Sequence, residues 1–300
     1  MTAPIGTETL HLGEFVPPLA AFVLYSWAYL ARVRTLRRQG RPVASWRRAC
    51  FFSGALLVTA VQCPPLDGLA DDVLIAHMVQ HLIIGDVASF LVVLGLTGPL
   101  LLPILRWRPT RWLRPLSHPV VALALWALDY YIWHIPLLYQ AALRHDLIHA
   151  LEHASYFWFG TLLWLALLGP LPKPAWFSNW ARLGYVVVVR FAGAALANAF
   201  IWAGTVFYPY YDGRDVHYGL NPLSDQNVAG AIMMLEQIIL TTLLLAWLFM
   251  RAAVQDEERQ ALLDLADSRG VALTPERAAR AAASGSAERL RRRLEDEDSG

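Results

Sequence analysis

Seven apolar stretches alternate with short polar segments along the chain, near 15–33, 46–64, 73–97, 119–141, 147–169, 183–207 and 228–250. Each is long enough for a helix to cross the roughly 30 Å hydrocarbon core of a bilayer. Prolines and glycines mark the gaps between them. Because only helices and closed barrels satisfy their backbone hydrogen bonds in lipid, the pattern predicts an all-α fold, a polytopic bundle of seven transmembrane helices over residues 1–254.

The charged residues concentrate after the last apolar stretch. Residues 255–300 hold 8 of the 25 Lys and Arg and 11 of the 24 Asp and Glu. This segment predicts a charged tail that is partly disordered or forms a short helix. The whole chain is 56% hydrophobic and only 16% charged, whereas soluble domains carry about 25% charged residues. A soluble enzyme is therefore excluded, and the lipid bilayer is the expected surrounding.

Basic residues are distributed unevenly between the loops. Residues 32–48 hold seven arginines, 106–114 hold four, and 173–182 hold one lysine and one arginine, whereas 66–72 hold three aspartates and no basic residue. Short loops rich in Lys and Arg stay on the cytoplasmic side. The pattern predicts an N-terminus outside, a C-terminus in the cytoplasm and multi-pass insertion in the plasma (inner) membrane. A net charge of +1 gives no reason to expect a nucleic-acid partner.

Histidines gather at the predicted outer ends of three stretches. His77 and His81 open the third stretch, His149 and His153 open the fifth, and His134 lies near the end of the fourth. An i,i+4 spacing places two imidazoles on one helix face, about 6 Å apart along the axis, so one helix can supply two ligands to a metal. The alternative is a hydrogen-bonded cluster that only ties helix ends together.

The residue types at these positions suit several metals. Imidazole suits Cu, Zn, Fe and Ni, and the thioether of Met78 favours Cu(I). Met78 follows His77 directly, so it points about 100° away around the helix and is the weaker candidate. The candidate metal ligands are His77, His81, His134, His149, His153 and Met78.

Four ionisable residues fall inside the predicted spans, namely Asp86, Asp129, Arg190 and Glu236. Such groups are costly in lipid and face partners or a cavity. As the only arginine among these four, Arg190 is expected to pair with one of the three carboxylates. The resulting network is either a structural ion pair or part of a proton or ion path.

Three further expectations concern the ends of the helices. Glu152 is expected to be an exposed acid near the positive end of its helix, in preference to a carboxylate that orients a histidine. Ser224 or Asp225 is expected to cap the start of the seventh helix. The tyrosines at 208, 210 and 211 are expected in an interfacial aromatic belt.

Four motifs in order along the chain resemble the CtaG-type cytochrome c oxidase assembly factor family. They are His77-Met78-Val79-Gln80-His81, Trp133-His134-Ile135-Pro136, His149-Ala150-Leu151-Glu152-His153 and Asp225-Gln226-Asn227-Val228-Ala229-Gly230. The resemblance covers about residues 15–250. It implies a polytopic plasma-membrane protein that helps to mature the haem–copper terminal oxidase through copper handling, with subunits of that oxidase as partners.

The leading hypothesis is a non-catalytic membrane protein that binds copper at its outer face and supports oxidase assembly. One alternative is an electron carrier in which histidines clamp a b-type haem. Another is a transporter or channel whose path is lined by the ionisable residues inside the spans. A third is a scaffold without metal.

Overall fold

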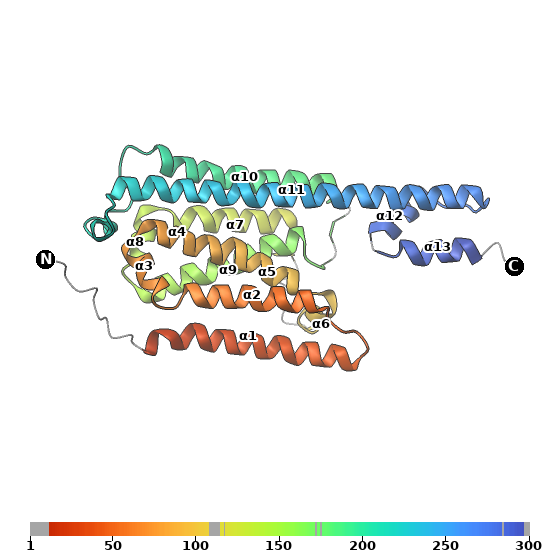
Figure 1. The fold of residues 1–300 in the computed structure, drawn as a ribbon, viewed down its shortest axis with the longest axis horizontal. Coiled ribbons are helices and arrows are strands. Elements are labelled where there is room, and N and C mark those ends of the chain that lie inside the picture. Colours follow the sequence, from red (N-terminus) through yellow and green to blue (C-terminus); the bar gives the residue numbers. More distant parts are fainter. Residues whose placement is uncertain are drawn as a thin grey trace. The chain divides into compact units, whose positions relative to one another are not determined.

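The computed structural model of the chain describes residues 12–107, 115, 116, 118–171, 173, 174, 176–283 and 285–296. Every regular element in these residues is a helix (Figure 1). The chain divides into two compact units, Met1–Phe177 with Val187–Ile238, and Ser178–Val186 with Ile239–Gly300. The first unit holds all the predicted site residues.

Helices of the first half of the chain belong to the first unit. They are α1 (Leu12–Arg38), α2 (Ser45–Val61), α3 (Leu66–Asp72), α4 (Leu74–Leu82), the π-helical turn η1 (Ile83–Ala88), α5 (Ser89–Gly95) and α6 (Gly98–Arg106). The segments α4, η1 and α5 follow one another directly and coincide with the predicted stretch at 73–97. The π-helical turn is a feature that the apolar pattern does not predict.

The rest of the first unit contains α7 (Pro119–Trp133), α8 (Pro136–Ala142), α9 (Asp146–Leu167) and the 3₁₀ turns η3 (Pro209–Tyr211) and η4 (Asp215–Tyr218). The helix α9 packs against α5, η1 and α7, and α2 packs against α5 and η1 (Figure 1). This packing brings the beginnings of α4 and α9 to the same end of the bundle.

Two long helices, α10 (Asn179–Trp202) and α11 (Pro222–Ser268), continue from one unit into the other. The second unit also holds α12 (Pro275–Ala283) and α13 (Ala287–Asp296), which share a small apolar core with the last turns of α11. Leu262 and Ala278 are fully buried in this core. The division of the chain at residue 254 into a membrane domain and a tail stays a prediction.

Four helical segments of the described residues are long and apolar enough to cross a membrane, namely Phe15–Arg38, Leu74–Gly95, Asn179–Trp202 and Pro222–Ser268. Two bent pairs pass the same test together, α2 with α3 at 52° and α7 with α8 at 79°. The described residues thus hold four such spans, or six if each bent pair crosses as one. The apolar helices agree with a membrane protein.

The predicted count of seven differs from these numbers because of α9. This helix coincides with the predicted fifth stretch, but it is outside the set of long apolar helices. Its first turns carry His149, Glu152 and His153, and these polar side chains lower its mean hydropathy. Most of the predicted inner loop at 106–114 lies outside the described residues. The seven-span count and the orientation of the termini therefore stay predictions.

A candidate metal centre

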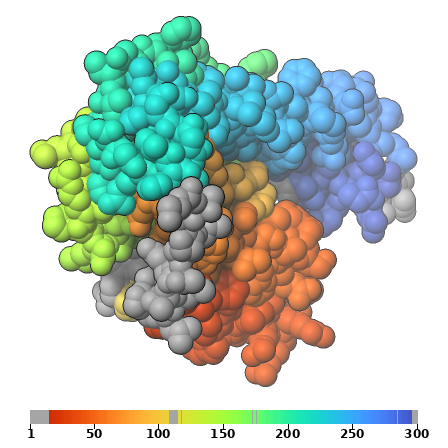
Figure 2. Space-filling view, turned by 60° about the vertical axis from the view of Figure 1, so that its left-hand side comes forward, coloured from red at the N-terminus to blue at the C-terminus, as the bar shows by residue number. Residues whose placement is uncertain are grey.

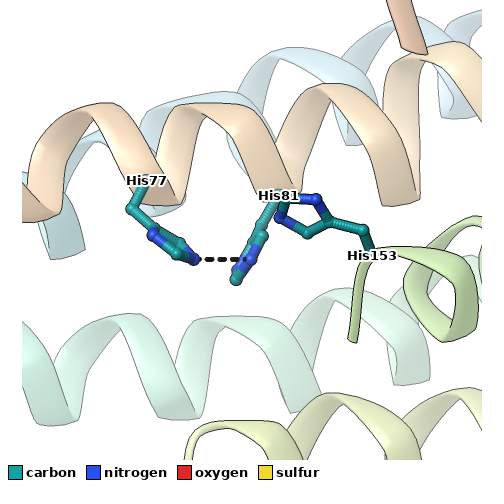
Figure 3. Close-up of side chains that lie close together, drawn as sticks. All are labelled: His77, His81 and His153. Atoms are coloured by element: carbon teal, nitrogen blue, oxygen red, sulfur yellow. Dashed lines mark hydrogen bonds between the residues drawn. The ribbon is translucent and has the colours of Figure 1, made fainter. Parts of the chain in front are cut away.

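Four histidines and one glutamate from α4 and α9 meet inside the first unit. His77 and His81 lie one turn apart on α4, and His149, Glu152 and His153 lie on the first turns of α9. Two groups of three residues have ligand atoms within 4.8 Å of one another: His77 with His81 and His153, and His77 with His149 and Glu152. These five residues form the histidine–glutamate cluster, three members of which are drawn in Figure 3.

The spacing of the cluster suits one small ion. The Nε2 atoms of His77 and His81 are 2.9 Å apart, which corresponds to a ligand–metal–ligand angle of about 90° at ordinary metal–nitrogen distances. The ring centres of His149 and His153 are 4.2 Å apart, and those of His77 and His149 are 5.4 Å apart. Two nitrogens on one ion lie at most about 4.2 Å apart, so the ligand atoms of each group, which lie within 4.8 Å of one another, must move closer together to share an ion.

The hydrogen bonds of His77 involve both of its ring nitrogens. Its Nδ1 lies 3.3 Å from the carbonyl oxygen of Ala70, so an Nδ1–H donor there leaves the lone pair on Nε2, which lies at hydrogen-bond distance, 2.9 Å, from Nε2 of His81. A backbone acceptor that fixes the tautomer in this way is typical of metal-binding histidines. The Nε2 atoms of His149 and His153 are buried without a hydrogen-bond partner. The cluster therefore presents several nitrogen lone pairs to a shared space.

Glu152 is buried, and the expectation of an exposed helix-start acid was wrong. Its side chain has no solvent exposure, and both carboxylate oxygens lack a hydrogen-bond donor. One of these oxygens lies 3.7 Å from Nε2 of His81. The sequence did carry a signal for this position, because Glu152 is three residues after His149 and thus shares its helix face.

His134 lies near the cluster but belongs to neither group of candidate ligands. It follows the last residue of α7, where Pro136 begins α8 at a sharp bend. Its Nδ1 lies 2.7 Å from the carbonyl oxygen of Tyr130 and 3.2 Å from the hydroxyl of Tyr156. Its Nε2 is buried and has no partner. Met78 is buried on α4, and because it follows His77 directly, its side chain leaves the helix about 100° around from that of His77.

Tyrosines from α8 and η3 cover the cluster. The ring of Tyr139 lies 5.2 Å from that of His77 and stacks on Tyr208 at 3.9 Å. The hydroxyl of Tyr211 donates to the carbonyl of Ala70 at 3.3 Å. Burial raises the pKa of Tyr211 above its ordinary value, so this hydroxyl keeps its proton. Figure 2 shows the segment before α11, in teal, against the yellow-green region that includes α8.

Two of the three tyrosines expected in an interfacial belt are core residues instead. Tyr208 and Tyr211 are each 1% exposed. The hydroxyl of Tyr208 donates to the carbonyl of His134 at 2.9 Å. Their proximity to the cluster depends on the path of the segment between α10 and α11, which local sequence patterns do not encode. The belt interpretation was wrong for both residues.

Asp225 fixes the start of the helix that carries His77 and His81. Its carboxylate accepts hydrogen bonds from the backbone N–H groups of Leu74 and Ile75, at 2.7 and 2.9 Å. These are donors of the first turn of α4, which have no partner within their own helix. The expectation that Asp225 or Ser224 precedes the seventh helix was wrong, because α11 already begins at Pro222. Asp225 caps a neighbouring helix instead.

The predicted polar network forms around Arg190. Its guanidinium lies 3.6 Å from a carboxylate oxygen of Asp86 and 3.6 Å from one of Glu236. The three residues come from η1, α10 and α11. Asp129 is not part of this network in the described contacts, since its carboxylate accepts from the indole N–H of Trp133 at 3.0 Å.

The order of these features along the chain matches one protein family. Residues 27–255 match the family described as cytochrome c oxidase caa3 assembly factor (Caa3_CtaG). The chain belongs to this family. The match includes every residue of the histidine–glutamate cluster and of the polar network and ends before α12. No curated protein and no solved structure shows a significant match.

Membership confirms the resemblance drawn from the four motifs. The family consists of assembly factors for cytochrome c oxidase.

Proposed function

We propose that this assembly factor binds copper in the histidine–glutamate cluster and passes it to the terminal oxidase during assembly. The observation that carries the proposal is the convergence of ligand atoms from α4 and α9 to within 4.8 Å, in a buried space. Neither helix alone supplies the full set. The proposal gives the cluster a task that fits an oxidase assembly factor.

The unpartnered polar atoms favour an ion over a purely structural cluster. The Nε2 atoms of His149 and His153 and both oxygens of Glu152 are buried without hydrogen bonds. Leaving a buried polar group without a partner costs about 1–3 kcal/mol. A cation bound by either group of ligands would satisfy the lone pairs of that group, and one beside Glu152 would also balance the charge of its carboxylate. A cluster that only joined two helices would gain nothing from these orphaned atoms.

The chemistry of the ligands favours copper, and their spacing favours a bare ion. Imidazole and carboxylate sites bind Cu(II) more tightly than the other divalent first-row metals. A haem held by two histidines needs room for the porphyrin ring between them. The Nε2 atoms of His77 and His81 are only 2.9 Å apart, and His149 and His153 are also in ring contact. The haem alternative therefore has no support in this geometry.

The position of the cluster suits exchange with a partner at the membrane surface. His77 is the fourth residue of α4 and His149 is the fourth residue of α9. With the predicted orientation, both helix beginnings face the outside of the plasma membrane. Copper centres of the oxidase that lie on this side would receive the metal there.

A double substitution of His77 and His81 tests this function in cells. His77→Ala with His81→Ala removes the residue shared by both ligand groups and its neighbour one turn on. We expect the protein to stay in the membrane, while oxidase activity and the copper content of the purified oxidase fall. Oxidase activity is measured on membranes from cells that carry the variant as their only copy. Copper content is measured on the oxidase purified from these membranes.

The matched control is His217→Ala, which removes an exposed histidine of η4 outside the cluster. Its oxidase activity should equal that of the unchanged chain. Normal activity and normal copper content in the double variant would disprove the proposed role of the cluster.

A further inference from the structure

A small space also borders His81. It is a cavity of about 20 Å³, which is room for one water-sized species. Its walls come from α4, η1, α7, α9 and α11 and include Met78, His81, Asp86, Tyr130, His134 and Met233. We refer to it as the methionine cavity.

Three side chains on its wall are suited to a soft cation. Met78 and Met233 are each 1% exposed and bring thioethers from α4 and α11. His134 brings an imidazole whose Nδ1 faces the carbonyl oxygen of Tyr130 at 2.7 Å. An Nδ1–H donor to that carbonyl leaves the lone pair on Nε2, which is buried without a partner.

Methionine often fills irregular gaps in an apolar core, and most of this lining is apolar, but the wall also includes polar residues. The unpartnered Nε2 of His134 and a carboxylate oxygen of Asp86 lie on residues that line it. Thioether sulfur is a weak hydrogen-bond acceptor and gains little from water. Thioether and imidazole together are a ligand set that favours Cu(I).

We propose that Met78, Met233 and the Nε2 of His134 form a second metal site that binds Cu(I), separate from the histidine–glutamate cluster. The inference rests on the proposed function for the choice of copper over other soft ions. It also accounts for the two predicted ligands that the cluster leaves out, since Met78 points about 100° away from His77 around α4. His81 borders both sites.

The site is tested on the purified full-length chain loaded with Cu(I) under reducing conditions. The variant is Met78→Leu with Met233→Leu, because Leu and Met have similar volumes and the core tolerates this exchange. We expect the variant to lose one equivalent of Cu(I) per chain. We also expect the sulfur scattering in the copper X-ray absorption spectrum to disappear. Ag(I), which does not change its oxidation state, should show the same loss.

The matched control is Met234→Leu, which changes the residue next to Met233 without touching the cavity wall. This control should keep both the one equivalent of Cu(I) and the sulfur scattering. His134→Ala should also lose one equivalent of Cu(I), because the nitrogen ligand is gone. Unchanged Cu(I) binding in the variant Met78→Leu with Met233→Leu would overturn the inference. The absence of sulfur scattering from the unsubstituted chain would also overturn it and leave water as the occupant of the cavity.

A variant of the other site separates the two claims. His149→Ala with His153→Ala should keep the sulfur-ligated Cu(I) while losing metal from the histidine–glutamate cluster. If this variant loses no metal, the cluster proposal fails and the cavity proposal stands. If the unsubstituted chain binds copper through imidazole alone, the cavity proposal fails and the cluster proposal stands.

Discussion

Glu152 supplies the only carboxylate of the histidine–glutamate cluster. It is fully buried, and its oxygens lie beside His81 without a hydrogen-bond donor. In the proposed copper site, an ionised Glu152 would supply the negative charge that offsets a cation. At the residue scale, the proposal therefore gives the glutamate the electrostatic part of metal binding and the histidines the directional part.

Replacing Glu152 with glutamine should weaken copper binding by about 10–100-fold, in the range found when groups around a metal site are lost. The amide keeps the shape of the side chain but removes its charge. Competition against a coloured chelator measures the affinity. Asp146→Asn, an exposed substitution at the first residue of the same helix, is the control and should leave the affinity unchanged. Equal affinities for all three chains would show that the carboxylate does not take part.

Close packing of α9 against the π-helical turn η1 positions the cluster at the scale of elements. A Cβ atom on Gly160 would lie 2.0 Å from the carbonyl oxygen of Gly85, so only glycine fits at this crossing. The carbonyls of the turn are used by neighbours, since Ser89 donates to Gly85 and the indole N–H of Trp164 donates to Asp86 at 3.1 Å. Small residues at such crossings are typical of packed membrane helices.

Gly160→Ala should lower the apparent unfolding temperature of the detergent-purified protein. Overpacking of this kind costs about 1–3 kcal/mol, because the added methyl group forces α9 away from η1. Gly184→Ala on α10 is the matched control, since nothing lies within 4 Å of its Cβ position. Alanine is favoured over glycine inside a helix, so the control should be as stable as the unchanged chain or more so. Equal destabilisation by both would contradict the packing argument.

At the scale of the whole molecule, the apolar pattern predicts where most helices lie. The stretch at 46–64 corresponds to α2, and the stretch at 183–207 corresponds to α10. Pro136 also gives a local reason for the bend after His134, because proline disfavours a helical residue before it. The continuation of α11 to Ser268 is not visible in hydropathy, since its last turns are charged.

The candidate site is predictable only in part. The i,i+4 spacing fixes that His77 and His81 share a face, as do His149 and His153, but not that the two faces meet. Their meeting depends on the packing of α9 against η1, which directly follows α4, and the roles of Asp225 and Tyr211 depend on contacts far apart in sequence. Metal ligands with sequential spacing are thus readable from the chain, whereas their long-range partners are not.

Copper content of the purified full-length chain tests the central claim most directly. The protein is loaded with copper, freed of loose metal and analysed by mass spectrometry beside the variant His149→Ala with His153→Ala. We expect the unchanged chain to retain copper in stoichiometric amounts with imidazole scattering, and the variant to retain one equivalent less. No stoichiometric copper in the unchanged chain, or the same amount in both, would contradict the account.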